Sequence, residues 1–274
     1  MDRMKEQAKR FGTTYIADDV SSIEACESDS VKPTYRVTLS DDSQLEASSL
    51  IIATGSSFRK LGVPGEQELS GHGVSYCATC DGFFFRNKPI VVVGGGDSAF
   101  EEALFLTRFG SSVTLIHRRD SFRASQIMVD RAKANPTITL MTNTVVTSIT
   151  GTSSPTQNTG APIAIPGLTL KRPAVAPASV SSIAVRNVVT GEESTLDTNA
   201  VFVAIGHTPA TDFAAGVVDR DDDGYVVVQG ASTVTSAPGI FAAGDCVDRT
   251  YRQAISAAGM GCRAALDAQA YLTD

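Results

Sequence analysis

Histidine and cysteine are scarce in this sequence, with three histidines and five cysteines among 274 residues. A structural zinc site needs four such ligands, commonly two Cys-x-x-Cys pairs or one pair with closely spaced histidines. The chain has one Cys-x-x-Cys pair, Cys77 and Cys80, and the nearest histidine, His72, has no second histidine three to five residues away. We therefore predict no metal site and favour redox chemistry for this pair, with two buried loop cysteines as the plainer alternative.

A net positive charge and long apolar runs are also lacking. The net charge is −7 and no basic stripe occurs, so a nucleic acid is not expected as a partner. No apolar run approaches the ~20 residues that span a bilayer, and the first residues lack the apolar core of a secretory signal. The odd cysteine count fits a reducing compartment, so we expect a cytoplasmic protein, with an organelle address left open.

What the sequence does contain is a dinucleotide-binding pattern shortly after the cysteine pair. Residues 90–93 form an apolar run typical of a buried parallel strand, and a glycine-rich turn follows them at once. A helix is predicted over 98–109, and its N-terminus suits a pyrophosphate. The turn and the helix start supply the predicted binding residues Gly94, Gly95, Gly96, Asp97, Ser98 and Ala99.

A second strand, predicted at 112–116, ends where an NAD-binding protein carries an acid for the ribose hydroxyl. This chain has a basic cluster there, which consists of His117, Arg118, Arg119 and Arg123. Arginines bind a 2′-phosphate through charge-assisted bonds, whereas an acid repels it. The cluster therefore predicts NADPH, and a solvated basic turn is the alternative.

These motifs resemble those of the low-molecular-weight thioredoxin reductases. The resemblance rests on the run Cys77-Ala78-Thr79-Cys80-Asp81-Gly82-Phe83-Phe84, on the turn at 94–99 and on the basic cluster. It implies an α/β fold with two Rossmann-like domains, one for FAD and one for NADPH. The FAD domain is then discontinuous, at 1–57 and 210–274, and the NADPH domain at 58–209 carries the cysteine pair.

The resemblance also assigns further residues to FAD. They are Thr54, Gly55, Gly244, Asp245, Arg252, Gln253 and Ala254. Two of these assignments have plainer alternatives. Thr54 and Gly55 fit an ordinary strand end, and Asp245 fits a helix N-cap.

Two segments depart from the family pattern. The family's FAD domain opens with its own G-x-G-x-x-G, and this sequence has that motif only once, so the first βαβ unit is expected to be absent and the domain N-terminally incomplete. A truncated gene model, a fragment and a divergent chain all fit. Residues 151–179 are rich in proline and small polar residues, which predicts a flexible insertion.

The local pattern predicts further elements outside the middle of the chain. Before the cysteine pair, strands are expected at 15–20, 22–26, 35–39 and 45–53. Near the C-terminus, a strand ending at Asp245 precedes a helix over 254–271.

By resemblance, electrons pass from NADPH through FAD to the Cys77–Cys80 disulfide and then to thioredoxin, with a homodimer expected. Cys80 is then the flavin-facing sulfur, Cys77 attacks the partner, and Asp81 handles a proton. The alternative for Asp81 is a turn residue before Gly82. Two other functions stay open: a flavin reductase for another dithiol carrier, and a non-catalytic NADPH-binding product.

Overall fold

The computed structural model describes residues 2–26, 32–153, 164–165, 168–169 and 178–273. The chain divides into two compact units. One, which we call the central unit, is Phe58–His207, and the other, the terminal unit, combines Met1–Ser57 with Thr208–Asp274. The second boundary thus lies at 207/208, where the sequence placed it at 209/210.

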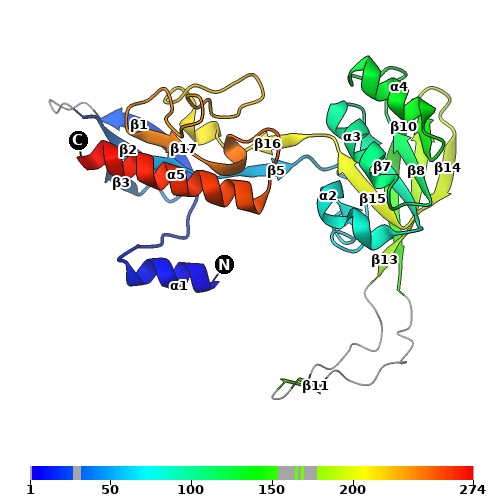
Figure 1. Ribbon diagram of the computed structural model, residues 1–274, viewed down its shortest axis with the longest axis horizontal. Coiled ribbons are helices and arrows are strands. Elements are labelled where there is room, and N and C mark those ends of the chain that lie inside the picture. The colour runs from blue at the N-terminus through cyan, green and yellow to red at the C-terminus, as the bar shows by residue number, and fades with distance from the viewer. Residues whose placement is uncertain (1, 27–31, 154–163, 166–167, 170–177, 274) are drawn as a thin grey trace. The chain divides into compact units, whose positions relative to one another are not determined.

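A five-stranded parallel sheet in the order β6-β15-β7-β8-β9 is the centre of the central unit (Figure 1). Its strands are β6 (Val74–Ser75), β7 (Pro89–Gly94), β8 (Ser112–Ile116), β9 (Ile138–Met141) and β15 (Ala200–Ala204). The predicted α/β class is confirmed, and β8 has the bounds predicted from the sequence, 112–116.

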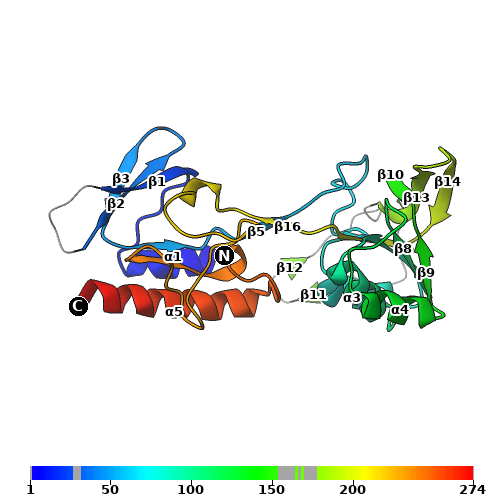
Figure 2. The same ribbon diagram turned by 90° about the horizontal axis from the view of Figure 1, so that it is seen from above.

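Both faces of this sheet are covered, as Figure 2 shows. Helices α3 (Asp97–Leu106) and α4 (Gln126–Ala134) lie on one face. On the other lies an antiparallel sheet of β10 (Thr144–Thr152), β13 (Ser179–Asn187) and β14 (Glu193–Asp197). In β7, Ile90 and Val92 pack on the helices while Val91 and Val93 pack on the second sheet. A strand buried on both faces reads as a continuous apolar run, which is why 90–93 could be recognised.

The cysteine pair lies between β6 and β7, on α2 (Ala78–Asp81), which runs into the 3-10 helix η1 (Gly82–Phe85). Gly82 has φ −54° and lies against Leu106, and a Cβ at Gly82 would come within 2.9 Å of that side chain. Asp81 and Gly82 therefore continue a helical path, and the alternative prediction of an Asp-Gly turn is wrong.

The predicted insertion at 151–179 joins β10 to β13, which pair up to Thr152 and Ser179. Within it, β11 (Ala164–Ile165) pairs with β12 (Leu168–Thr169). The other residues between 154 and 177 lie outside the described part of the chain, and with them most of the segment predicted to be flexible.

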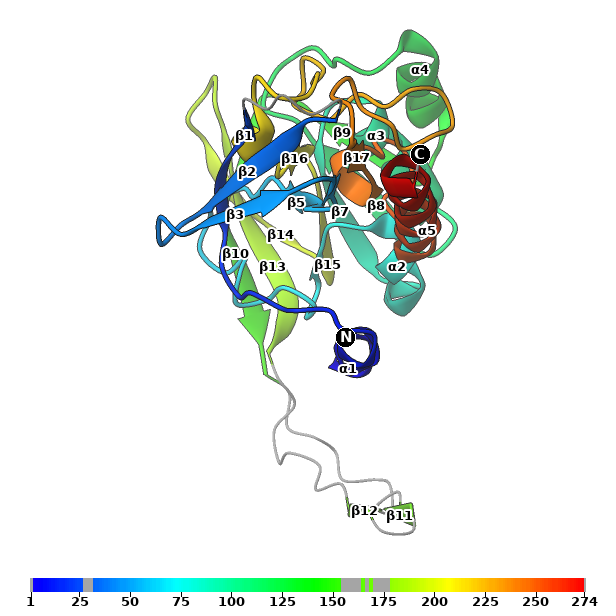
Figure 3. The ribbon, with the colours of Figure 1, turned by 90° about the vertical axis from the view of Figure 1, so that its left-hand side faces the viewer.

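The terminal unit contains an antiparallel sheet of β1 (Val20–Cys26), β2 (Thr34–Leu39) and β3 (Gln44–Ala47), whose strands lie side by side in Figure 3. A parallel pair, β4 (Leu50–Ile52) with β17 (Ile240–Ala242), packs on α5 (Ala254–Thr273). The unit also holds α1 (Asp2–Arg10) and the 3-10 helices η2 (Asp212–Ala214) and η3 (Gly244–Cys246). The two chain crossings between units are β5 (Ser56–Phe58) and β16 (His207–Pro209), which pair.

Two strand predictions in the terminal unit are wrong. Residues 15–19 are not a strand, and Tyr15 and Ile16 are 43% and 53% exposed. The run at 45–53 is two strands in different sheets, because the chain leaves the antiparallel sheet after Ala47 and Ser49 donates its hydroxyl hydrogen to the carbonyl of Gly239. Among the described residues, no helix has both the length and the apolarity to cross a bilayer.

Candidate functional site

Cys77 and Cys80 form a disulfide with a Cα–Cα distance of 5.3 Å. Cys77 is half-buried at the start of α2, and Cys80 is exposed. The other cysteines are free thiols, namely Cys26, Cys246 and Cys262. Within the described ranges no group of three or more His, Cys, Asp and Glu side chains could hold a metal ion.

Polar groups surround this disulfide. The buried Ser75 hydroxyl donates to Oδ2 of Asp81 over 2.7 Å and accepts a hydrogen bond from the N–H of Cys77 over 3.1 Å. The hydroxyl of Thr79 lies 3.3 Å from Sγ of Cys77. Asp81, singled out by sequence, is thus held beside the pair by Ser75, which sequence reasoning missed because nothing in the pattern marks a strand-end serine.

The glycine-rich turn between β7 and α3 is sterically constrained. A Cβ at Gly94 would collide with the carbonyl of Ala204 and the methyl of Ala99, and one at Gly95 would collide with the His117 ring. At Gly96 the space is open. The turn therefore packs closely against its neighbours and leaves backbone accessible at the N-terminus of α3, as an anion requires.

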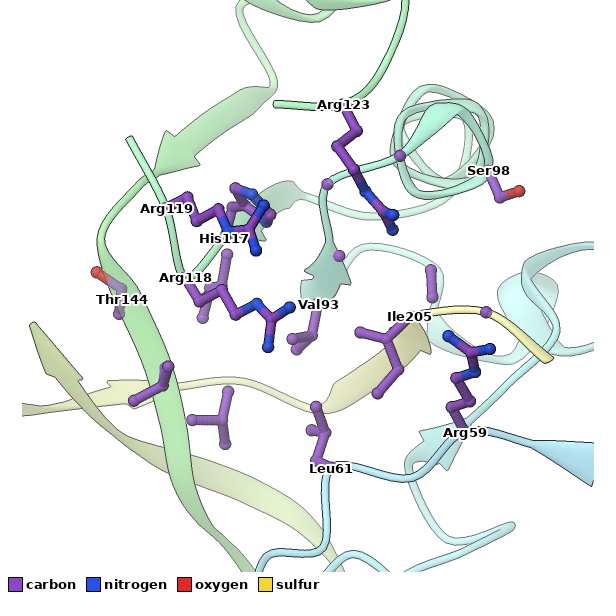
Figure 4. Close-up of a pocket in the computed structure, with 18 of the residues that line it drawn as sticks. Arg59, Leu61, Val93, Ser98, His117, Arg118, Arg119, Arg123, Thr144 and Ile205 are labelled. Carbon is purple, nitrogen blue, oxygen red and sulfur yellow. The ribbon is translucent and has the colours of Figure 1, made fainter. Parts of the chain in front are cut away.

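A cavity of about 570 Å³ opens over this turn within the central unit. Its polar lining includes Ser98 and the basic side chains Arg118, Arg119 and Arg123, and its described lining residues include no carboxylate. Figure 4 shows Arg118 and Arg123 reaching into the cavity from two different sides. The cavity is therefore electropositive and suits a multiply charged anion.

Two of the predicted binding residues have structural partners instead of a place in the cavity wall. Asp97 accepts hydrogen bonds from the N–H and the hydroxyl of Ser125, both over 2.8 Å, and so ties the start of α3 to the start of α4. Ala99 is fully buried, where helix meets strand. Both shape the turn from behind the surface that a ligand would touch.

His117 has a different character from the arginines beside it. Its ring lies 5.2 Å from Phe122, and its Nε2 is buried with no hydrogen-bond partner. Burial, followed by the charges of Arg118 and Arg119, holds the pKa of His117 below its usual range, against two backbone hydrogen bonds that raise it. The ring is therefore neutral at neutral pH, and the positive charge of this cluster is that of its arginines.

The cavity also contains basic residues that the sequence did not single out. Arg59 and Lys60 line it, as do Ile205 and Gly206. Figure 4 shows Arg59 near Ile205. The sequence feature that could have identified them is this pair of adjacent cations directly after β5. Sequence reasoning missed them because the segment is held at the cavity by a hydrogen bond from the Arg59 N–H to the carbonyl of Gly206, just after β15.

In the terminal unit, Gly244 and Asp245 lie on η3, directly after β17. Oδ1 of Asp245 is buried with no hydrogen-bond partner. Burial and the charge of Asp248 raise the pKa of Asp245, while Arg252 lowers it. Ala243 is the N-cap residue of η3, so the alternative prediction of Asp245 as an N-cap is wrong.

The other predicted flavin residues lie in the same unit. Gly55, at φ 72°, accepts a hydrogen bond from the N–H of Ala210, and Thr54 donates its hydroxyl hydrogen to the carbonyl of the same residue over 2.6 Å. Arg252 has a left-handed backbone (φ 48°), and its Nε is buried without a partner. Gln253 precedes α5, which begins at the exposed Ala254.

Comparison with known proteins places this geometry in context. The model of a family described as pyridine nucleotide-disulphide oxidoreductase matches residues 4–261. Thioredoxin reductase of Mycolicibacterium smegmatis is 50% identical over the whole chain, which spans 78% of that relative. The bifunctional thioredoxin reductase/thioredoxin of Mycobacterium leprae is 49% identical, with 53% of its length covered. The crystal structure of thioredoxin reductase from Streptococcus pyogenes superposes with a TM-score of 0.83 at 36% identity, covering 99% of this chain and 79% of that one.

Proposed function

Because this chain belongs to the thioredoxin reductases, within the pyridine nucleotide-disulphide oxidoreductase family, we propose that it reduces the disulfide of thioredoxin at the expense of NADPH, with Cys77 and Cys80 as its own electron carrier. The observation that carries the proposal is the disulfide of α2 in the same compact unit as an arginine-lined dinucleotide cavity. When bound, NADPH supplies two electrons as a hydride and FAD relays them to a disulfide.

The central unit fits NADPH. The open backbone at Gly96 and the N-terminus of α3 suit a pyrophosphate. Arg118, Arg119 and Arg123 suit the 2′-phosphate that distinguishes NADPH from NADH, because no acidic side chain is found among the described residues that line the cavity. Arg59 lies on the cavity wall and adds charge for the same ligand.

The terminal unit offers polar groups that fit a flavin. The buried oxygen of Asp245 without a partner is an acceptor for a hydroxyl group, and a ribityl chain presents such hydroxyls. The raised pKa of Asp245 reflects that burial. A Cβ at Gly55 would meet nothing within 4 Å, and one at Gly244 would lie 3.6 Å from the methyl of Ala257, so the backbone at Gly55 is open.

The exchange between the dithiol and the partner disulfide can be written with this chain's own groups, with all bonds, electrons and protons accounted for. The Cys77 thiolate bonds to one partner sulfur as the partner's disulfide breaks, and Thr79 is placed to donate a hydrogen bond to that thiolate. Cys80 then loses its proton to Asp81 and attacks Cys77, which releases the second partner thiolate. Two electrons and two protons leave the dithiol, and the Cys77–Cys80 bond forms again.

An exposed aromatic surface favours a protein as the partner. Phe83 and Phe84, directly after the pair, are 59% and 70% exposed, and the Arg86 guanidinium lies 4.7 Å from the Phe83 ring centre. Exposed aromatics with an arginine are typical of the centre of a protein interface. A small disulfide would use little of this surface.

The proposal is tested with the purified chain, FAD in excess, NADPH and oxidised thioredoxin. We expect one NADPH to be consumed for each thioredoxin disulfide reduced, and much slower turnover with glutathione disulfide or lipoamide. Consumption of NADPH without thiols appearing on thioredoxin would overturn the assignment. Faster turnover with a small disulfide would replace thioredoxin by that carrier.

Family membership also supports a cytoplasmic homodimer, which we include in the proposal. Sedimentation equilibrium over a range of concentrations tests the dimer. A mass that stays at 28.7 kDa at every concentration would contradict it.

A further inference from the structure

Ser75 is a buried hydroxyl residue that links both ends of the redox segment. Its side chain is 5% exposed at the end of β6. The hydroxyl donates to Asp81 over 2.7 Å and accepts from the Cys77 N–H over 3.1 Å. The backbone N–H of Asp81 in turn donates to the carbonyl of Cys77 over 3.1 Å. Asp81 is therefore tied to Cys77 twice, once through the backbone and once through Ser75.

The serine itself is held firmly. Ser75 pairs with Phe202 of β15 in the parallel sheet, and Phe202 is fully buried. A hydroxyl on a strand of a packed core keeps its position, whereas a carboxylate on the last residue of a four-residue helix can rotate. The sheet thus provides a fixed point for Asp81 that α2 does not provide.

Space is available into which Asp81 would otherwise turn. A cavity of about 150 Å³ is lined by Ser75, Asp81, Phe84 and Phe85 together with Gly71, Gly73 and Val74. A cavity of this size holds several water molecules, which can hydrate a freed carboxylate. Without the Ser75 bond, the carboxylate has this alternative position.

We propose that Ser75 is a positioning residue for thiol–disulfide exchange, which holds the Asp81 carboxylate beside the cysteine pair so that it can accept the proton of Cys80. This rests on the proposed function, because it concerns the proton step of that exchange. The proton passes from the Cys80 thiol to the carboxylate as the Cys77–Cys80 bond forms, and the electron pair of the broken bond leaves on the partner sulfur. Ser75 itself exchanges no proton with the substrate.

The test measures exchange without any cofactor. The chain is reduced with dithiothreitol, desalted and mixed either with the aromatic disulfide 5,5′-dithiobis(2-nitrobenzoate) or with oxidised thioredoxin, across the neutral pH range. We expect Ser75→Ala to slow closure of the Cys77–Cys80 bond about tenfold, a modest part of the 10²–10⁴ that general acid–base catalysis contributes. Ser75→Thr keeps the hydroxyl, so it should retain most of the wild-type rate.

A double-mutant cycle separates positioning from simple destabilisation. In an Asp81→Asn background, Ser75→Ala should have almost no further effect on the rate and on its pH dependence. Thr198→Ala removes another buried hydroxyl of the central unit, one that bonds to the carbonyls of Pro89 and Ala200, and should leave exchange unchanged. Equal slowing by Ser75→Ala in both backgrounds, or no slowing in either, would overturn the proposal.

The two substrates keep this inference distinct from the proposed function. If the reduced wild type reacts with the aromatic disulfide but not with thioredoxin, the assigned partner is wrong, and the Ser75 cycle can still be read. If the wild type reacts with both and Ser75→Ala behaves like it, the positioning role is wrong and the function stands.

Discussion

The central and terminal units differ in how completely their described residues enclose a core. In the central unit, a five-stranded parallel sheet is covered on both faces, and the cavity, its arginines and the disulfide all belong to that unit. In the terminal unit, β4 and β17 form a two-stranded parallel sheet, in which Ile51 is 43% exposed. No residue of α1 is buried.

This difference indicates in which unit a single substitution should have a specific effect on binding or reaction. A binding site needs rigid supporting elements if its groups are to be held in place. The central unit supplies these to the arginine cavity and to the disulfide, so single side chains there should have sharp effects. Asp245 and Arg252 in the terminal unit have buried atoms without partners, and we expect a bound flavin to complete their hydrogen bonding.

The largest expected effect comes from the disulfide. Cys80→Ser should abolish NADPH-dependent reduction of thioredoxin, because the exchange needs two sulfurs to release the partner. Cys77→Ser should do the same. Activity is measured as thiols formed on thioredoxin, with Cys262→Ser as the control, since Cys262 is an exposed free cysteine in the other unit. Normal turnover by either active-site variant would remove the pair from the reaction.

Next in size is coenzyme choice in the central unit. Arg118→Ala with Arg119→Ala should weaken NADPH binding by tenfold or more, because each charge-assisted bond is worth about 1.5–3 kcal/mol, and should leave NADH almost unchanged. Isothermal titration with both coenzymes measures this. The control, Arg131→Ala with Lys133→Ala, removes the same charge from α4 outside the cavity. An equal loss for both coenzymes would contradict the 2′-phosphate assignment.

A smaller effect is expected in the terminal unit. Asp245→Asn should weaken FAD retention by about tenfold, roughly 1.4 kcal/mol, and leave NADPH affinity unchanged. Flavin fluorescence during titration reports the first value and calorimetry the second. Asp222→Asn, on an exposed residue of the same unit, is the matched control. A loss of NADPH affinity of similar size would show that the two sites are not separable in this way.

The smallest expected effect is a pH dependence of stability in the central unit. Glu102 of α3 accepts a hydrogen bond from the N–H of Ala78, and its Oε2 is buried without a partner. Burial raises the pKa of Glu102 from 4.5 to about 7, helped by the charge of Glu101. The charged groups on the elements packed against α3 are Asp81 of α2 and the exposed Asp130, Arg131 and Lys133 of α4.

Because the folded pKa lies above the unfolded one, the contribution of Glu102 to stability is full below about pH 4.5 and is lost as the pH rises to about 7. Glu102→Gln should therefore raise the free energy of unfolding at pH 8 by about 1–2 kcal/mol, reduced from the full linkage value by partial solvation. Urea melts at pH 5 and pH 8 measure it, with the exposed Glu68→Gln as control. A gain of equal size at both pH values would argue against linkage.

The sequence was informative where burial is complete on both faces. β7 lies in the middle of the parallel sheet, and its uninterrupted apolar run, Ile90 to Val93, is typical of a strand buried on both faces. The glycine pattern was informative because close contacts at Gly94 and Gly95 allow no side chain. In the terminal unit, the apolar residues at 15–20 led to a wrong strand prediction. The spacing of apolar residues and the composition do not tell whether a partner strand is present.

The residues that sequence reasoning missed are those defined by long-range neighbours. Ser75 acts through Asp81, which comes within reach only because α2 turns back on β6. Arg59 reaches the cavity because the segment after β5 hydrogen-bonds to Gly206 at the end of β15, far along the chain. Such residues have ordinary types at ordinary positions, and only the tertiary fold gives them a role.

The most direct test of the account is to follow every cysteine through one catalytic cycle by alkylation and mass spectrometry. With FAD and one equivalent of NADPH, Cys77 and Cys80 should become alkylatable, while labelling of Cys26, Cys246 and Cys262 stays constant. Oxidised thioredoxin should then close the pair again and acquire two thiols itself. Thioredoxin reduction while Cys77 and Cys80 stay disulfide-bonded throughout would contradict the central claim that this pair carries the electrons.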